Sequence, residues 1–122
     1  ESSAKYVDAQ LRLYDVYIKR MKPLTLQNIE HASQAIYALR GRTEDSRYYL
    51  AQGDVYRAAW QLARSGQLPA TMTIAGVSGT TPNALGAAAA ESYRQYLRRE
   101  QHPEERETVV RNKQEVSPWR LF

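Results

Sequence analysis

Apolar residues recur every three or four positions near the start of the chain. The recurrence runs from Ser3 to Met21 at spacings of four, three, four and three, which is the spacing of one face of an α-helix. The residues of this stripe are Val7, Leu11, Tyr14, Ile18 and Met21. Pro23 follows, and the predicted helix ends there because proline lacks a backbone donor and disfavours helical geometry in the residue before it.

A second helix is predicted between Thr25 and Gly41. Threonine is a favourable N-cap, and glycine readily adopts the left-handed conformation that ends many helices. The apolar side of this helix carries Leu26, Ile29, Ala32, Ile36 and Leu39. We expect the first two helices to form an antiparallel hairpin. Its predicted contact residues are Leu11, Tyr14, Ile18, Ile29 and Ile36.

A third helix is predicted to begin at Thr43 or Ser46 and to continue until Gly66. The same rhythm of three and four residues joins Tyr49, Gly53, Tyr56, Trp60 and Ala63. Gly53 and the Asp54 that follows it leave two alternatives open. Either the helix continues at a cost of about 1 kcal/mol for the glycine, or it breaks there into two short helices.

The stretch from Gly66 to Ala90 contains no charged residue, although charged residues make up 25% of the chain. Charges are the residues most strongly excluded from protein cores and from the centres of interfaces. We therefore expect this stretch to be buried in the domain or covered by a partner. Its first half is predicted to be locally extended, with turns at Gly76 and Gly79. The apolar residues that alternate there are Leu68, Ala70, Met72 and Ile74.

A fourth helix is predicted to open with Thr81 as its N-cap and Pro82 as its first residue. Arg94, Arg98 and Arg99 crowd its last turns, where cations suit the helix dipole. After Pro103, a short helix is predicted from Glu104 to about Gln114. Its many charges indicate a strut that is not buried. Pro118 then leads into an apolar and aromatic terminus, which contains Trp119, Leu121 and Phe122.

These patterns together predict an all-α fold. We expect a small bundle of four to five helices with an irregular uncharged loop at about residues 66–80 and an extended aromatic C-terminal tail. A helical domain is predicted over residues 1–102, followed by a charged short helix and a docking tail over residues 103–122. A length of 122 residues is sufficient for a hydrophobic core of its own.

The composition is that of a soluble, basic protein with a net charge of +4. The chain has no cysteine, which fits a reducing compartment, so we expect an intracellular or organelle-interior location. It begins at Glu1 rather than methionine, which indicates a processed or trimmed chain. No run of residues approaches the roughly 18 to 20 apolar residues of a membrane span.

The residue patterns of enzymes are missing from the sequence. The two histidines, His31 and His102, have no partner at a spacing suited to a metal site. The loop from Gly76 to Gly79 lacks the lysine and the full glycine spacing of a P-loop. The carboxylates lie scattered beside lysines and arginines, as on a solvated surface. We therefore expect no catalytic residue, no metal site and no cofactor.

Clusters of basic residues make nucleic acid the alternative partner. The candidate contacts for a polyanion are Lys19, Arg20, Lys22, Arg40, Arg42, Arg47, Arg98 and Arg99. Residues 55–97 also resemble a helix-turn-helix DNA-binding segment. The residues that carry the resemblance are Ala58, Ala59 and Leu62 in a helix, Ile74 and Ala75, the turn Gly76, Val77 and Ser78, and a second helix from Thr80 through Leu85.

The helix-turn-helix resemblance implies that the second helix would enter a groove of DNA. Two features depart from the family's pattern. Residues 69–75, which stand in the place of the first motif helix, are short and rich in β-favouring types, and the front of the second helix carries no arginine or lysine.

The expected function is that of a non-enzymatic accessory or structural subunit of a larger protein assembly. Residues 66–90 and 116–122 contain apolar residues in addition to the helical stripes that form the core. Such additional apolar surface is usually covered by a partner protein. The predicted interface residues are Met72, Ile74, Val77, Trp119, Leu121 and Phe122. Two alternatives stay open: the tail folds back onto the fourth helix, or the protein binds nucleic acid, through the helix-turn-helix-like segment or as a nucleoprotein or coat-type subunit.

Overall fold

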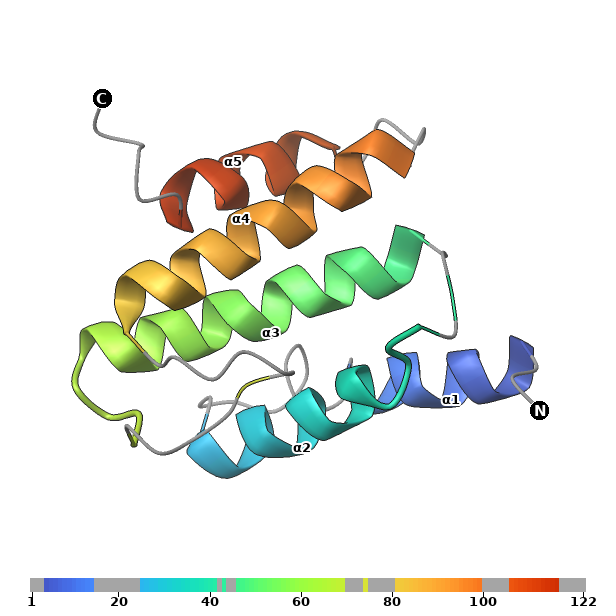
Figure 1. The fold of residues 1–122 in the computed structure, drawn as a ribbon, viewed down its shortest axis with the longest axis horizontal. Helices are drawn as coiled ribbons and strands as arrows, with labels where there is room; N and C mark the ends of the chain where they lie inside the picture. Colours follow the sequence, from blue (N-terminus) through green and yellow to red (C-terminus); the bar gives the residue numbers. More distant parts are fainter. Residues whose placement is uncertain are drawn as a thin grey trace.

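The computed structural model describes residues 4–14, 25–41, 43, 46–69, 74, 81–99 and 106–116. These residues form five α-helices: α1 (Ala4–Tyr14), α2 (Leu26–Tyr37), α3 (Ser46–Arg64), α4 (Pro82–Arg99) and α5 (Arg106–Val116) (Figure 1). The prediction of an all-α fold is confirmed. Of the predicted loop and tail, residues 70–73, 75–80 and 117–122 lie outside the described residues.

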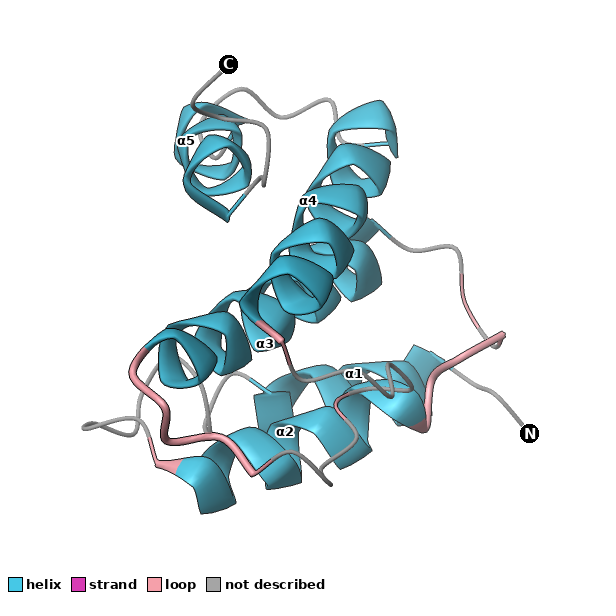
Figure 2. Cartoon of the chain, turned by 60° about the vertical axis from the view of Figure 1, so that its left-hand side comes forward, coloured by secondary structure: helices cyan, strands magenta, loops and turns pink. Residues whose placement is uncertain are grey.

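Each helix packs mainly against its neighbours in sequence. α1 contacts α2 and α3, while α2 contacts α3, α3 contacts α4, and α4 contacts α5. Consecutive helices run in opposite directions (Figure 1). α3 and α4 share the most extensive contact and lie at the centre, with α1 and α2 on one side of the pair and α5 on the other (Figure 2). The predicted antiparallel hairpin of the first two helices is present.

α2 and α4 begin at their predicted capping residues and α3 ends just before Gly66, whereas α2 ends at Tyr37 with Ala38 as its C-cap, before the predicted stop at Gly41. The Thr25 hydroxyl oxygen accepts a hydrogen bond from the Asn28 backbone N–H at 3.1 Å, and the Thr81 hydroxyl oxygen accepts one from the Ala84 backbone N–H at 3.2 Å. Each bond satisfies a backbone donor that has no partner within its own helix. Gly41 and Gly66, which follow α2 and α3, have φ angles of 74° and 75°. An L side chain rarely adopts this conformation, so glycine suits both positions.

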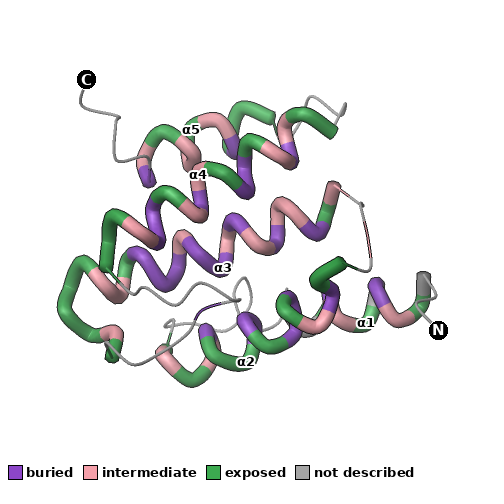
Figure 3. The backbone as a smooth tube through the Cα atoms, viewed as in Figure 1, coloured by how far each residue is buried: buried purple, intermediate pink, exposed green. Residues whose placement is uncertain are grey.

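The core lies between the facing sides of the helices (Figure 3). The apolar stripe of α2 is buried as predicted, with Ile29, Ile36 and Leu39 fully enclosed. Leu11 of α1 is also buried, whereas the side chain of Tyr14 and all of Ile18 lie outside the described residues. The largest fully buried side chains are Tyr93, Tyr96, Ile29, Ile36, Leu39, Ile74, Leu85, Val55 and Val116.

Helix α3 continues through Gly53 and Asp54, which decides between the two alternatives for this position. The ring of Tyr93 on α4 lies directly over Gly53. A Cβ atom at residue 53 would be 2.6 Å from Cε1 of that ring, so only glycine leaves room for the tyrosine. The Tyr93 hydroxyl donates a hydrogen bond of 2.6 Å to Oδ1 of Asp54. Gly53 and Asp54, which look like a helix break in the sequence, therefore form the packing and hydrogen-bonding site of Tyr93 from the neighbouring helix.

Helix α5 does not stand away from the bundle, so the prediction of an unburied strut is wrong. Val109 and Val116 are buried against the rest of the domain. They are seven residues apart, which places them on the same side of a helix. The charged residues of α5 occupy its other sides. Arg57 of α3 also binds Glu115 of α5, with Nη2 and Oε1 2.6 Å apart.

The contact between α4 and the end of α5 depends on a glycine. A Cβ at Gly86 would lie against the backbone carbonyl oxygen of Val116 and 3.3 Å from the Trp60 ring. A glycine at this position lets backbone approach backbone closely. The last described turn of the chain is thus held against α4 and α3.

Candidate interaction surface

The last turn of α3, the residues that follow it and the first half of α4 expose very little charge among the described residues. The two helices are antiparallel, so the C-terminal end of α3 lies beside the N-terminal end of α4 (Figures 1 and 3). Arg64 is the one charged residue among the exposed positions of 61–69 and 81–90 that the structure describes. The uncharged exposed ones, which we call the uncharged surface, are Gln61, Ser65, Gly66, Gln67, Pro69, Thr81, Pro82, Asn83 and Ala87.

Only part of the missing charge in residues 66–90 is explained by the core. Ile74, Leu85, Gly86 and Ala89 are buried, and a charge at any of these positions would lose its hydration. Asn83 and Ala87, on the opposite side of α4, are exposed to solvent and carry no charge either. The fold therefore gives no reason for the absence of charge on the uncharged surface.

Apolar side chains border this surface. Leu62, Leu68 and Ala88 are partly buried and pack against the core with part of their surface accessible. Arg64 lies over the ring of Trp60, with its guanidinium carbon 4.7 Å from the ring centroid. The charge at this end is thus placed over an aromatic face.

The predicted interface residues fall mostly outside what the structure describes. Ile74 is described and is fully buried in the core of its own chain, so its side chain has no surface left for a partner. The others, which lie outside the described residues, are Met72, Val77, Trp119, Leu121 and Phe122. Their assignment to an interface stays a prediction.

The opposite end of the molecule is rich in arginine. It gathers the C-terminal ends of α2 and α4 and the N-terminal ends of α3 and α5 (Figure 1). Arg99 lies over the ring of Tyr49 with its guanidinium carbon 4.3 Å from the centroid, and Arg40 lies over the ring of Tyr37 at 5.6 Å. Arginine stacks on aromatic rings in many proteins, and its guanidinium is also well suited to bind phosphates.

The candidate polyanion contacts divide into described and undescribed residues. Arg40, Arg47, Arg98 and Arg99 are exposed and lie at this arginine-rich end. Lys19, Arg20, Lys22 and Arg42 lie outside the described residues.

The sequence segments that contain the described arginines of this end are balanced in charge. Residues 40–47 and 98–107 together contain six arginines and six carboxylates. The arginines are Arg40, Arg42, Arg47, Arg98, Arg99 and Arg106, and the carboxylates are Glu44, Asp45, Glu100, Glu104, Glu105 and Glu107. Because the sequence is balanced here, the arginines do not add up to a field that would attract a polyanion from a distance.

The front of α4, which resembles the recognition helix of a helix-turn-helix protein, carries no basic side chain. Its exposed residues are Thr81, Pro82, Asn83 and Ala87, while Leu85 is fully buried. The resemblance thus has no arginine or lysine with which α4 would contact phosphates or bases at this end.

Polar contacts inside the domain join α3 to α4. The Ser92 hydroxyl donates to Oε1 of Gln52 at 3.0 Å, close to the Tyr93–Asp54 bond. Burial, followed by the charge of Asp54 and the hydrogen bond to it, raises the pKa of Tyr93 far above its ordinary value. These groups fix the register of the two helices, and each buried polar side-chain atom among the described residues has a hydrogen-bond partner.

A second buried tyrosine lies closer to the arginine-rich end. Burial and the neighbouring Tyr48 raise the pKa of Tyr56 to about 12, and the charge of Arg40 opposes the shift. A hydroxyl with such a pKa stays protonated at neutral pH. Tyr56 therefore contributes an uncharged ring to the core.

One exposed aromatic residue, Tyr37, is not among the predicted interface residues. Tyr37 of α2 is 49% exposed and is the one large hydrophobic side chain that is exposed among the described residues. A signal exists in the sequence, since Tyr37 lies off the apolar stripe formed by Ile29, Ile36 and Leu39. The helical rhythm would have placed it on the outside.

Comparisons with family profiles, with curated proteins and with solved structures found no match. Among the described residues, no histidine or carboxylate cluster of three or more is arranged to hold a metal ion. Within the same residues, none of the helices combines the length and apolar character needed to cross a membrane.

Proposed function

We propose that this chain is an accessory or structural subunit of a larger protein assembly and that it docks through the uncharged surface. The observation that carries the proposal is the contrast between the two ends of the domain. Among the described residues of 61–69 and 81–90 the one exposed charge is Arg64, whereas the described part of the opposite end gathers four exposed arginines, Arg40, Arg47, Arg98 and Arg99. The centres of protein interfaces are depleted of charge, because a charge covered without a partner loses its hydration.

The backbone beneath the uncharged surface is already ordered for docking. Thr81 caps the first turn of α4, and α4 is held along its length by α3. A partner that covers this turn has little chain entropy to remove. Pro82 adds rigidity, since its ring fixes one backbone angle. These features support a preformed docking surface on the described part of the chain.

The proposal is tested by placing a negative charge in the middle of the surface. Asn83→Glu and Ala87→Glu each change an exposed residue of α4. Asn83 lies in the first turn of α4, where a carboxylate is favourable, and glutamate is a good helix former at the exposed position 87, so neither change should lower the stability of the domain. Thr108→Glu is the matched control, because it adds the same charge to an exposed position in the first turn of α5.

The readout is the mass of the native complex that forms around each tagged chain in its own cells. We expect the unaltered protein and Thr108→Glu to form one complex of defined mass. Asn83→Glu and Ala87→Glu should reduce its yield roughly tenfold, which corresponds to a loss of about 1.4 kcal/mol of binding free energy. Complexes of equal yield from all variants would show that another face is used. A chain that runs free in every case would refute the proposal.

Nucleic acid is the second candidate, and a specific observation favours it. Arg99 over Tyr49 and Arg40 over Tyr37 present two arginine–aromatic pairs at one end of the molecule. Binding through phosphates would weaken steeply between 50 and 200 mM salt, because counterions are released when phosphates are neutralised. Arg99→Gln would reduce the slope of this dependence by about one. No retention on heparin or on mixed DNA at low salt would exclude this candidate.

A further inference from the structure

The outward face of α2 carries little charge. Between Leu26 and Tyr37 this helix contains a single formal charge, that of Glu30. α3 and α1 cover the inner face, where the apolar stripe is buried. The exposed positions of the helix are Gln27, Glu30, His31, Gln34 and Tyr37. No described helix packs on this face.

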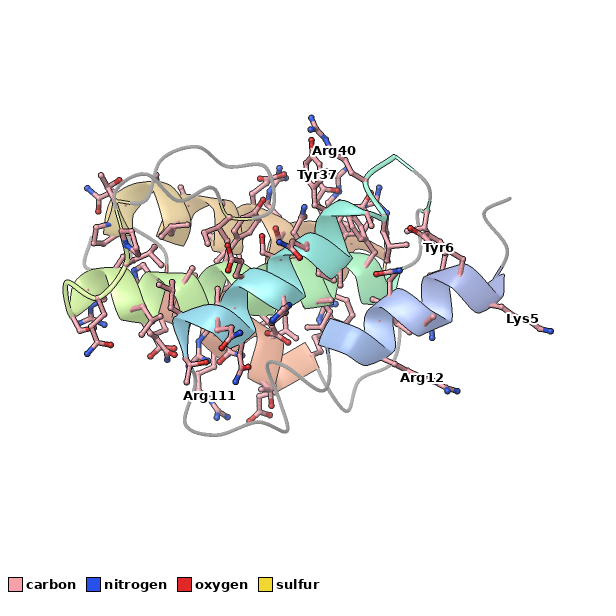
Figure 4. All side chains as sticks on the ribbon, turned by 90° about the horizontal axis from the view of Figure 1, so that it is seen from below. Lys5, Tyr6, Arg12, Tyr37, Arg40 and Arg111 are labelled. Atoms are coloured by element: carbon pink, nitrogen blue, oxygen red, sulfur yellow. The ribbon has the colours of Figure 1, made fainter. Side chains whose placement is uncertain are left out.

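Two charges stand at opposite ends of this face. Glu30 and Arg40 are both exposed, and neither forms a salt bridge among the described residues. Arg40 instead lies over the ring of Tyr37, and its Nη1 donates a hydrogen bond of 3.4 Å to the Tyr37 hydroxyl. Figure 4 shows Arg40 and Tyr37 projecting together from the end of α2. The ring holds the guanidinium in place.

The positions of these groups along the helix make the face complementary to itself. Glu30 and Tyr37 are seven residues apart, which is nearly two turns, so they lie on the same edge of the exposed face. Gln34 lies between them. A two-fold axis near Gln34 would lay a second α2 antiparallel across the first. Glu30 of each copy would then meet the Tyr37 and Arg40 pair of the other, since both groups are on the same edge and at opposite ends.

We propose that two copies of this chain pair through the outward faces of α2, with Glu30 of one copy bound to Arg40 of the other. The contact forms twice, as in any two-fold interface. Tyrosine and arginine, the residue types that most often dominate binding energy, lie at both ends. This pairing uses a different side of the domain from the uncharged surface and does not depend on the proposed function.

The size of the face sets the strength of the pairing. A stable interface buries about 1,200–2,000 Å² in total, and one helix of twelve residues offers less than that. The dimer is therefore weak, with a dissociation constant of roughly 10 µM to 1 mM. Salt should weaken it, because the two ion pairs lie at the edge of the contact.

Sedimentation equilibrium of the full chain over this concentration range tests the proposal. The unaltered protein should show a monomer–dimer equilibrium. Glu30→Arg places arginine against Arg40, and Arg40→Glu places glutamate against Glu30, each at both symmetric contacts. Either change alone should raise the dissociation constant about tenfold, since two attractions become two repulsions. Glu107→Arg, a charge reversal at an exposed position of α5, is the control and should change nothing.

Mixing the two variants gives the sharpest result. In a pair of one Glu30→Arg chain and one Arg40→Glu chain, each contact again joins a glutamate to an arginine. The mixture should therefore dimerise to within about threefold of the unaltered protein, although neither variant pairs well alone. Helix content and melting temperature of each variant identify any loss of fold, which mixing could not restore.

The other outcomes contradict the proposal. A chain that stays monomeric at 1 mM does not pair through α2. A dimer that is unaffected by Glu30→Arg uses another face. Weak pairing in the mixture, when both variants are folded, would show that Glu30 and Arg40 do not meet across the interface.

Discussion

Replacing Gly53 by alanine has two opposing effects on the free energy of unfolding. The helix preference of alanine raises it, and the loss of good packing against Tyr93 lowers it. Gly53 lies inside α3, where alanine is intrinsically favoured by about 0.8–1.0 kcal/mol. The new methyl group would be 2.6 Å from Cε1 and 2.7 Å from Cδ1 of Tyr93. Carbon atoms in good contact are about 3.5–4.0 Å apart, so the ring must move by about 1 Å.

The Tyr93 ring has little freedom to make this movement. It is fully buried, and its hydroxyl is bound to Asp54. Overpacking of a core costs about 1–3 kcal/mol, and a weakened hydrogen bond to a charged group costs up to about 1.5–3 kcal/mol more. After the gain in helix preference is subtracted, we expect Gly53→Ala to destabilise the domain by about 1–3 kcal/mol.

Urea unfolding followed by circular dichroism measures this free energy. A double-mutant cycle with Tyr93→Leu separates the two effects. Without the ring above it, the alanine should be neutral or should stabilise by up to about 1 kcal/mol. A Gly53→Ala protein that is more stable than the unaltered one, with Tyr93 in place, would refute the packing of Tyr93 on Gly53.

Three further predictions concern Gly86, two buried tyrosines and the C-terminal tail. Gly86→Ala should cost about 1–3 kcal/mol and speed amide exchange in α5, because the methyl group meets the Val116 carbonyl; unchanged exchange would contradict that close contact. Tyr56 and Tyr93 should ionise above the ordinary tyrosine pKa of 10.0 in an absorbance titration, and stability should fall as the pH rises above 10; a pH-independent stability between 10 and 12 would contradict their burial. Deleting residues 117–122 should abolish assembly at an unchanged melting temperature if the tail docks on a partner, whereas a lower melting temperature with assembly intact would show that the tail folds back on its own domain.

The sign of the tyrosine prediction follows from the direction of the shifts. Folding raises the pKa of Tyr56 from 10.0 to about 12 and raises that of Tyr93 as well. The folded state thus favours the protonated hydroxyls. Their contribution is complete below pH 10 and is lost as the pH rises toward the folded pKa values.

The helices could be predicted because their signals are local. Thr25, Gly66 and Thr81 each act on the backbone within four residues, so the sequence around them contains the whole cause. The apolar stripe of α2 is equally local, since one helix turn relates its members. These are the parts of the prediction that the structure confirms.

What the sequence could not reveal depends on residues far apart in the chain. Gly53 looks like a weak point in α3 until Tyr93, forty positions later, is placed over it. The docking of α5 likewise depends on Arg57, which binds a glutamate 58 positions later. Val109 and Val116 share one side of α5 and so indicate a buried face. The many charges of this segment favoured the opposite prediction.

The sequence shows that residues 66–90 carry no charge. It does not show which of these residues are buried in the core and which form the candidate surface. Ile74 was expected at an interface and lies in the core, whereas Asn83 and Ala87 remain exposed. An uncharged residue suits a core and an interface equally well, so composition does not distinguish the two. Only the packing of α4 on α3 separates the buried half from the exposed half.

The most direct test of the proposed function is the mass of the native particle that contains this chain, measured after nuclease treatment. The proposal predicts a particle heavier than two copies of the chain. The particle should keep its mass at 50 and 200 mM salt, and its remaining mass should be accounted for by other proteins in fixed ratio. A particle that falls to one or two copies after nuclease treatment, or that dissociates between these salt concentrations, would contradict it and favour nucleic acid as the partner.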